Sequence, residues 1–130
     1  NKVILQLDPN KKFIFYRGKS DKVINYYHTS DGFIFASSCE TFGLILAEAM
    51  MSSLPIICSN KSAMPEIIKD FTIYFNPEDE KDLIVKLRKF IISHELRTKI
   101  SLQSKESINY LSWAENARKT FSFIGENCKN

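Results

Sequence analysis

The 130-residue sequence lacks the long apolar runs of membrane proteins and the paired cysteines of secreted ones. No run of 18 apolar residues occurs, which excludes a transmembrane helix. No secretory signal opens the chain. Its cysteines are an odd number without paired spacing, at Cys39, Cys58 and Cys128. We therefore expect reduced, mostly buried thiols in an intracellular protein, and no zinc site.

An excess of charge of one sign is also lacking. The 18 basic and 15 acidic residues leave a net charge of only +3, and the lysines are scattered. The ten Phe and five Tyr fall in strand-like runs, so nucleic-acid binding is not expected. The 44% hydrophobic and 25% charged fractions are typical of one globular domain that can bury a core.

Short apolar runs alternate with helix-like segments along the chain, and the connections are short. This order predicts an α/β fold with a Rossmann-like parallel sheet and helices on both faces. The run at 33–36 is apolar on both faces, as in a covered parallel strand. Ligands of such sheets bind beyond the carboxyl ends of the strands. Strands are predicted at 12–16, 33–36, 56–58 and 71–75, and helices at 21–29, 42–52, 65–69, 76–91, 94–107 and 112–126.

Two of the helix starts carry specific expectations. Thr41 is predicted to cap the helix at 42–52. Ser112 and Glu115 fit a capping box that opens the last helix. Trp113 is expected to pack and to tie this last helix back to the domain.

The start of the helix at 42–52 is a candidate anion site. The backbone N–H groups of Phe42, Gly43 and Leu44 are predicted to lack intrahelical partners, and the helix dipole favours an anion there. Gly43 would let a phosphate approach the backbone, and the Thr41 hydroxyl can serve as a cap or as a ligand contact. The alternative interpretation is a plain capped helix with a packing glycine.

Two carboxylates, Glu40 and Glu48, flank this helix start. Glu48 is a lone charge in an apolar run, where burial without a partner is costly. Helix geometry offsets it from Glu40 by roughly 80° and 12 Å. A ligand could lie along the helix start with its phosphate at the tip and paired hydroxyls near the carboxylates. Alternatively, Glu48 pairs with a Lys or Arg across the sheet, or lies on the exposed side of the helix.

Six segments together resemble the C-terminal domain of retaining glycosyltransferases of the GT-B fold, the "group 1" family with a Glu-x7-Glu motif. The likeness extends in the right order over roughly residues 13–125. The combination is far more specific than the glutamate pair alone. The segments are FASSCETFGL (35–44), EAM (48–50), LPII (54–57), PEII (65–68), FNPED (75–79) and SW (112–113).

The resemblance implies a UDP- or GDP-sugar donor and retaining hexosyl transfer to a glycan or lipid-linked acceptor. Glu40 matches the first motif glutamate, the catalytic group near the transferred sugar, and Glu48 matches the glutamate that holds the ribose. The backbone from Thr41 through Phe42 and Gly43 to Leu44 matches the diphosphate-binding segment. Ser38 and Gly18 complete the donor-binding set, with Gly18 near the nucleotide base. No metal or other cofactor is expected, because a helix N-terminus and basic side chains stabilise the leaving diphosphate in this family.

The sequence departs from the family pattern at two small-residue sites. Ser62-Ala63 replaces a glycine pair, which makes a positive φ costly there, and Met51-Ser52-Ser53 replaces Ala-x-Gly.

The family's basic diphosphate contacts and acceptor-binding domain would lie upstream of residue 1. We therefore expect residues 1–130 to be a nucleotide-sugar-binding domain, a fragment of a longer two-domain cytoplasmic enzyme, inactive alone. Peripheral contact of the full-length enzyme with a membrane stays open. The alternatives are a non-catalytic binding module of the same fold and a GT-B nucleotide-sugar epimerase.

Overall fold

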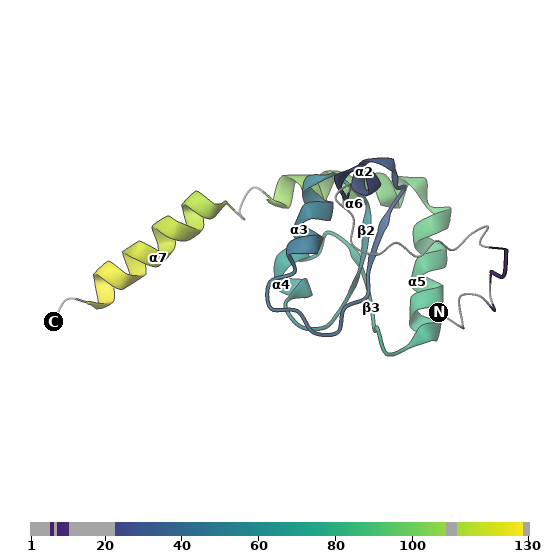
Figure 1. The fold of residues 1–130 in the computed structure, drawn as a ribbon, viewed down its shortest axis with the longest axis horizontal. Helices are drawn as coiled ribbons and strands as arrows, with labels where there is room; N and C mark the ends of the chain where they lie inside the picture. Colours follow the sequence, from purple (N-terminus) through teal and green to yellow (C-terminus); the bar gives the residue numbers. More distant parts are fainter. Residues whose placement is uncertain (1–5, 7, 11–22, 109–111, 129–130) are drawn as a thin grey trace.

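The computed structural model describes residues 6, 8–10, 23–108 and 112–128 (Figure 1). The predicted strand at 12–16, the start of the helix at 21–29, and Gly18 lie outside these residues. The described elements, in chain order, are α2 Val23–Thr29, β1 Phe33–Phe35, α3 Leu44–Met51, β2 Ile56–Ser59, α4 Met64–Ile68, β3 Ile73–Phe75, α5 Glu80–Ile92, α6 His94–Ser107 and α7 Trp113–Asn127.

The three described strands form a parallel sheet in the order β1-β2-β3. Phe33 lies opposite Ile56, and Ile57 lies opposite Ile73. Parallel neighbours need crossover connections, and helices supply them here. Figure 1 shows α5 on one face of the sheet and α3 with α4 on the other. The predicted Rossmann-like sheet with helices on both faces is therefore confirmed.

The core is centred on β2, whose four residues are all buried. It extends to Phe75 on β3 and to Leu46 and Met50 on α3. The prediction that β1 is covered on both faces is wrong for Ile34, which is 46% exposed. The reason is that α5 packs mainly on β2 and β3, while α6 packs on β2, α3 and α5.

The start of α3 differs from the prediction. The helix begins at Leu44, two residues later than expected, and its N-cap is Gly43 at φ 70° and ψ 49° without a side-chain cap. The prediction that Thr41 caps this helix is wrong, because the left-handed turn at Gly43 separates Thr41 from the first helical turn. In contrast, Asp79 caps α5 by accepting bonds from the Lys81 and Asp82 amides.

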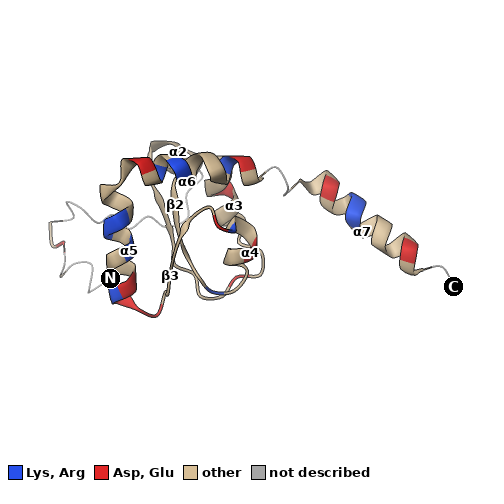
Figure 2. Ribbon diagram, turned by 180° about the vertical axis from the view of Figure 1, so that it is seen from behind, with Lys and Arg blue, Asp and Glu red and all other residues tan. Residues whose placement is uncertain are grey.

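Helix α7 has the predicted cap but not the predicted packing. The Ser112 hydroxyl accepts a bond of 3.5 Å from the Glu115 amide. Trp113, however, is 81% exposed, and no residue of α7 is buried. The helix projects away from the sheet (Figure 1), and acidic and basic residues share it (Figure 2). The expectation that Trp113 ties α7 back to the domain is wrong, because the Trp113 side chain is exposed. The cap and the Glu115–Arg118 ion pair both lie within the helix and do not attach it to the sheet.

The cysteines correct a further expectation. Cys58 is buried in β2, and burial raises the pKa of its thiol to about 12. Cys39 and Cys128 are exposed, one in the loop after β1 and the other just after α7, so the prediction of mostly buried thiols is wrong for these two. Among the described residues, no helix is both long and apolar enough to cross a membrane.

Candidate functional site

Three loops meet at the carboxyl edge of the sheet, where the sequence predicted the ligand. They follow β1, β2 and β3 (Figure 1). The Asn60 amide donates a bond of 2.9 Å to the Phe75 carbonyl, which joins the second loop to β3. The Lys61 ammonium lies 3.9 Å from the Glu78 carboxylate, which joins the second loop to the third. The edge is thus a set of connected loops.

Ser62 connects the second loop to the first and holds the backbone of Glu40. Its hydroxyl donates a bond of 2.6 Å to the Glu40 carbonyl and accepts one of 3.1 Å from the Glu40 amide. Ser62 has φ 56°. A positive φ is costly for a residue other than glycine, as expected at this position, where serine replaces a glycine of the family pattern. A glycine there would avoid the strain but would lack the hydroxyl that makes both bonds. The two bonds fix the Glu40 backbone, and the Glu40 side chain is partly exposed.

Gly43 is required by both conformation and packing. Its φ of 70° is disfavoured for other residues, and an added Cβ would lie 3.3 Å from Cδ1 of Ile67 on α4. This supports the interpretation of Gly43 as a packing glycine without testing a ligand role. Because the helix starts at Leu44, its free first-turn amides begin at Leu44, and the prediction that Phe42 and Gly43 belong to that turn is wrong. Thr41 and Ser38 are exposed on the approach to this turn.

Glu48 lies on the exposed side of α3 and has an unexpected partner. The Tyr27 hydroxyl on α2 donates a bond of 3.0 Å to Glu48 Oε2. Of the alternatives, exposure is therefore confirmed, and no Lys or Arg among the described residues forms an ion pair with Glu48. The apolar neighbours gave the wrong indication because Leu44, Ile45 and Met51 are themselves exposed. Burial, the hydrogen bond to Glu48 and the charge of Glu48 raise the pKa of Tyr27 to about 12.

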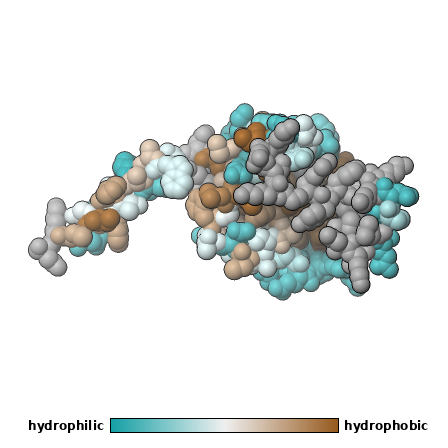
Figure 3. Space-filling view, viewed as in Figure 1, coloured by the Kyte–Doolittle hydropathy of each residue, from teal (hydrophilic) through white to brown (hydrophobic). Residues whose placement is uncertain are grey.

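Glu48 also borders a hollow of about 470 Å³ between α3 and the start of α7. Phe42, Leu44 and Trp113 supply apolar walls, and Asn116 supplies a polar one. Figure 3 shows apolar side chains gathered over α3 on this side of the molecule. The hollow is large enough for part of a nucleotide-sized ligand. Glu40 is not among its lining residues.

A larger hollow of about 830 Å³ lies at the opposite end of the sheet, between α5, α6 and the residues that precede β1 and β2. Asp31, His94 and Arg97 contribute polar groups to it. The Arg97 guanidinium is already used, since it donates to the Phe90 and Ile91 carbonyls. This hollow lies at the amino edge of the sheet, whereas the ligand site was predicted at the carboxyl edge.

The family follows from a comparison with known families. Residues 1–107 match the family model described as "Glycosyl transferases group 1". The chain belongs to the group 1 glycosyl transferase family. The resemblance to the group 1 family, inferred from six sequence segments, is thereby confirmed.

The names of two relatives of this group 1 chain refer to different sugars. It is 31% identical over 100 residues to "Sulfoquinovosyl transferase SQD2" of Arabidopsis thaliana, covering 73% of this chain and 20% of the relative. It is 31% identical over 109 residues to "Serotype-specific mannosyltransferase WbdA" of Escherichia coli, covering 83% and 13%. The chain thus spans a fifth or less of these relatives.

Solved structures show the same fold. A glycosyltransferase from Rickettsia africae ESF-5 aligns with a TM-score of 0.80 at 25% identity, covering 99% of the group 1 chain and 36% of that structure. The C-terminal domain of the group 1 protein LpcC from Francisella tularensis aligns with a TM-score of 0.68 at 28% identity, covering 83% and 57%. The second match agrees with the C-terminal domain predicted from the sequence.

Sequence reasoning missed two residues that contact the candidate site glutamates: Tyr27 bonds to Glu48 and Ser62 bonds to Glu40. Tyr27 lies in the helix predicted at 21–29, and no sequence signal pairs it with Glu48, 21 residues later. Ser62 was flagged as a departure from glycine, which was the available signal, but its bonds to Glu40 could not be foreseen. In the part of the chain that the structure describes, no three His, Cys, Asp or Glu side chains are grouped to hold a metal ion.

Proposed function

We propose that this chain is the donor-binding domain of a retaining glycosyltransferase that uses a UDP- or GDP-sugar. The observation that carries the proposal is the placement of Glu40 in the loop between β1 and α3, at the carboxyl edge of a parallel sheet, with Glu48 on the exposed side of α3 one turn beyond its start. Membership of the group 1 family and relatives named as transferases support it.

In the proposed mechanism, each part of the site has one task. The first-turn amides of α3, from Leu44 onward, and the backbone from Thr41 to Gly43 stabilise the charge of the leaving diphosphate. Glu40 lies beside the transferred sugar near the reacting carbon, in the loop that Ser62 holds. Glu48 accepts hydrogen bonds from the ribose hydroxyls. Ser38 adds a polar contact to the donor, and the site works without a metal.

The proposed enzyme is larger than this chain. Residues 1–130 would form its nucleotide-sugar-binding domain, and a second domain would bind the glycan or lipid-linked acceptor and supply basic contacts to the diphosphate. The enzyme would act in the cytoplasm. Because the relatives' names include both a mannosyltransferase and a sulfoquinovosyl transferase, the sugar is not assigned.

Titration calorimetry tests donor binding by the chain itself. UDP and GDP are titrated separately, each with and without a chelator. We expect weak binding of one nucleotide, with the same affinity in both conditions. Absence of binding to either nucleotide, or binding that requires a divalent metal, would contradict the proposal.

Substitutions in the full-length enzyme test the two carboxylates. Glu40→Gln is expected to lower kcat more than donor affinity, because Glu40 acts near the reacting carbon. Glu48→Ala is expected mainly to weaken donor binding, because it removes the ribose contact. Steady-state kinetics with varied donor separates the two effects. Wild-type kinetics in both variants would overturn the site assignment.

A further inference from the structure

Tyr27 presents its hydroxyl to Glu48 from a fixed ring. The ring is only 9% exposed and packs edge-on against Phe33, with centroids 6.0 Å apart and an interplanar angle of 67°. Phe33 in turn stacks on Phe35 at 5.9 Å within β1. The sheet and α2 therefore hold the phenol oxygen in place, and its bond of 3.0 Å to Glu48 Oε2 links this rigid part to an exposed side chain.

The bond leaves Glu48 able to bind a ligand. A carboxylate has about four acceptor positions, and Tyr27 uses one of them. Oε1 and the second position on Oε2 can still accept two hydroxyl groups in the carboxylate plane. No Lys, Arg or His among the described residues forms an ion pair with Glu48. Within the described part of the chain, the hydrogen bond from the neutral Tyr27 hydroxyl therefore orients the Glu48 carboxylate but does not neutralise its negative charge.

We propose that Tyr27 is a positioning residue that orients the Glu48 carboxylate toward the vicinal diol of the nucleotide ribose. This rests on the proposed function, since it assigns the ribose to Glu48. Without the phenol, the exposed Glu48 side chain samples several rotamers and must be ordered on binding. With it, the carboxylate is already in one plane when the nucleotide arrives.

The phenol is suited to this task over a wide pH range. Its pKa is raised to about 12, so the hydroxyl stays protonated and remains a donor throughout the neutral range. The orientation of Glu48 should therefore not vary between roughly pH 6 and 9, because this whole range lies at least about three units below the Tyr27 pKa.

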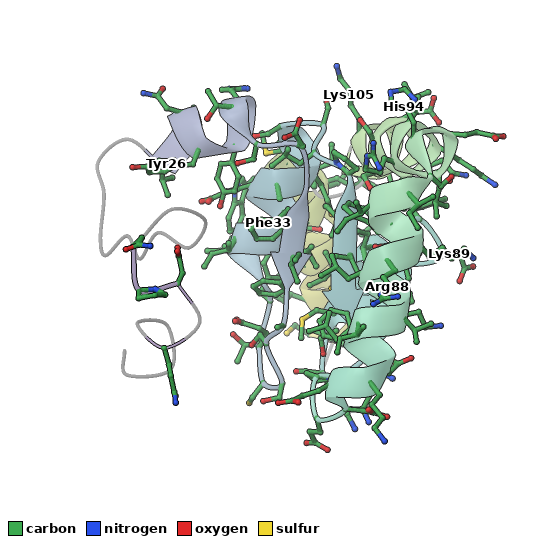
Figure 4. The ribbon with its side chains drawn as sticks, turned by 90° about the vertical axis from the view of Figure 1, so that its right-hand side faces the viewer. Tyr26, Phe33, Arg88, Lys89, His94 and Lys105 are labelled. Atoms are coloured by element: carbon green, nitrogen blue, oxygen red, sulfur yellow. The ribbon has the colours of Figure 1, made fainter. Side chains whose placement is uncertain are left out.

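Tyr27→Phe is the direct test, because it removes the hydroxyl and keeps the ring that packs on Phe33. Whichever of UDP and GDP binds the wild-type chain is titrated into the variant by calorimetry. We expect affinity to fall about threefold to tenfold, the cost of ordering one side chain. The matched control is Tyr26→Phe on the same helix: Tyr26 is 42% exposed, lies away from Phe33 in Figure 4, and should bind like the wild type.

A second background separates positioning from a general structural role. In a Glu48→Ala chain, adding Tyr27→Phe should change nucleotide affinity by less than about 1.5-fold, which is the precision of a titration, because the group that Tyr27 orients is gone. A loss of the same size in both backgrounds would overturn the positioning role. Equal affinity of Tyr27→Phe and wild type would overturn it too, while leaving the proposed function intact.

A measurement without nucleotide tests the contact itself. In Glu48→Ala, the pKa of Tyr27, followed by NMR of its labelled ring, should fall from about 12 and stay above 10.0, because burial remains when the carboxylate is removed. An unchanged pKa would overturn the Tyr27–Glu48 contact. If the wild-type chain binds neither UDP nor GDP, the proposed function fails and the ribose role of Tyr27 fails with it, whatever the pKa shows.

Discussion

Helices α3 and α7 are defined by opposite kinds of interaction. The start of α3 has no side-chain cap, and tertiary packing determines its position through Gly43 against Ile67 and through buried Leu46. Helix α7 has a serine cap and an ion pair between Glu115 and Arg118, and it buries none of its residues. Local signals thus explain α7 completely and α3 hardly at all.

The difference teaches where function can be placed. A candidate ligand site needs a rigid frame, and α3 has one because its position depends on the sheet and on α4. Helix α7 keeps its shape with little help from the domain, although its first turn borders the hollow beside Glu48. If this distinction is correct, substitutions in α3 should affect the whole domain and substitutions in α7 should not.

The largest effect on stability is expected from shortening a buried side chain of α3. Leu46 is fully buried, so Leu46→Ala should lower the free energy of unfolding by about 2–5 kcal/mol through lost transfer energy and a cavity. Phe121→Ala on α7 is the matched control, since Phe121 is 73% exposed, and it should change the value by no more than about 0.5 kcal/mol. Urea unfolding measures both. Comparable losses would erase the contrast between the helices.

The next largest effect on stability is expected at Gly43, before α3, and it is compared with Gly125 in α7. Gly43→Ala should cost about 1–3 kcal/mol, because alanine is strained at φ 70° and its Cβ meets Ile67. Gly125→Ala in α7 meets nothing within 4 Å and should instead favour the helix by up to about 1 kcal/mol. Chemical denaturation gives the first value, and far-ultraviolet circular dichroism gives the second. A neutral Gly43→Ala would show that packing does not determine the start of α3.

Ser62 sharpens the account at the Glu40 loop. Ser62→Ala keeps the positive φ and removes both bonds to Glu40, so it should cost about 1–2 kcal/mol. Ser62→Gly removes the same bonds and relieves the backbone strain, so it should cost about 1 kcal/mol less than Ser62→Ala. In both variants the Glu40 amide should exchange its hydrogen faster than in the wild type. Unchanged exchange would show that Ser62 does not hold the loop.

The smallest global effect is expected at the α7 cap. Ser112→Ala removes the acceptor for the Glu115 amide and should destabilise the helix locally by about 1 kcal/mol. Hydrogen exchange in the first turn of α7 should speed up, while the urea midpoint of the domain stays unchanged. A shifted midpoint would mean that α7 is part of the cooperative core.

The same contrast explains what the sequence could predict. The apolar runs at 33–36 and 56–58 and the cap at Ser112 are local patterns, and the structure has them with small shifts. The helix predicted from residue 76 is also present, but it begins at Glu80 after an Asp79 cap that was not predicted. The packing of Trp113 was wrongly predicted, and the apolar neighbours of Glu48 wrongly argued against its exposure, because an apolar neighbourhood in sequence does not specify which side faces water. The left-handed turn at Gly43 was likewise not predicted, because the helix start was assigned from the hydroxyl of Thr41 as a cap.

The candidate site divides in the same way. Glu40 and Glu48 could be selected from spacing and family resemblance. Ser62 and Tyr27, which hold them, come from segments 22 residues later and 21 residues earlier, and only the fold brings them into contact. The candidate ligand-contacting groups can thus be proposed from sequence more readily than the groups that contact them in the fold.

The most direct test of the central claim is to map where a nucleotide binds. UDP and GDP are titrated into the isotopically labelled chain while amide NMR shifts are recorded. The account predicts that the largest changes fall on Glu40 to Glu48 and are smaller at the same nucleotide concentration in Glu48→Ala, because that variant binds more weakly. Changes centred on the hollow near Asp31, Pro55 and His94, or no changes with either nucleotide, would contradict it.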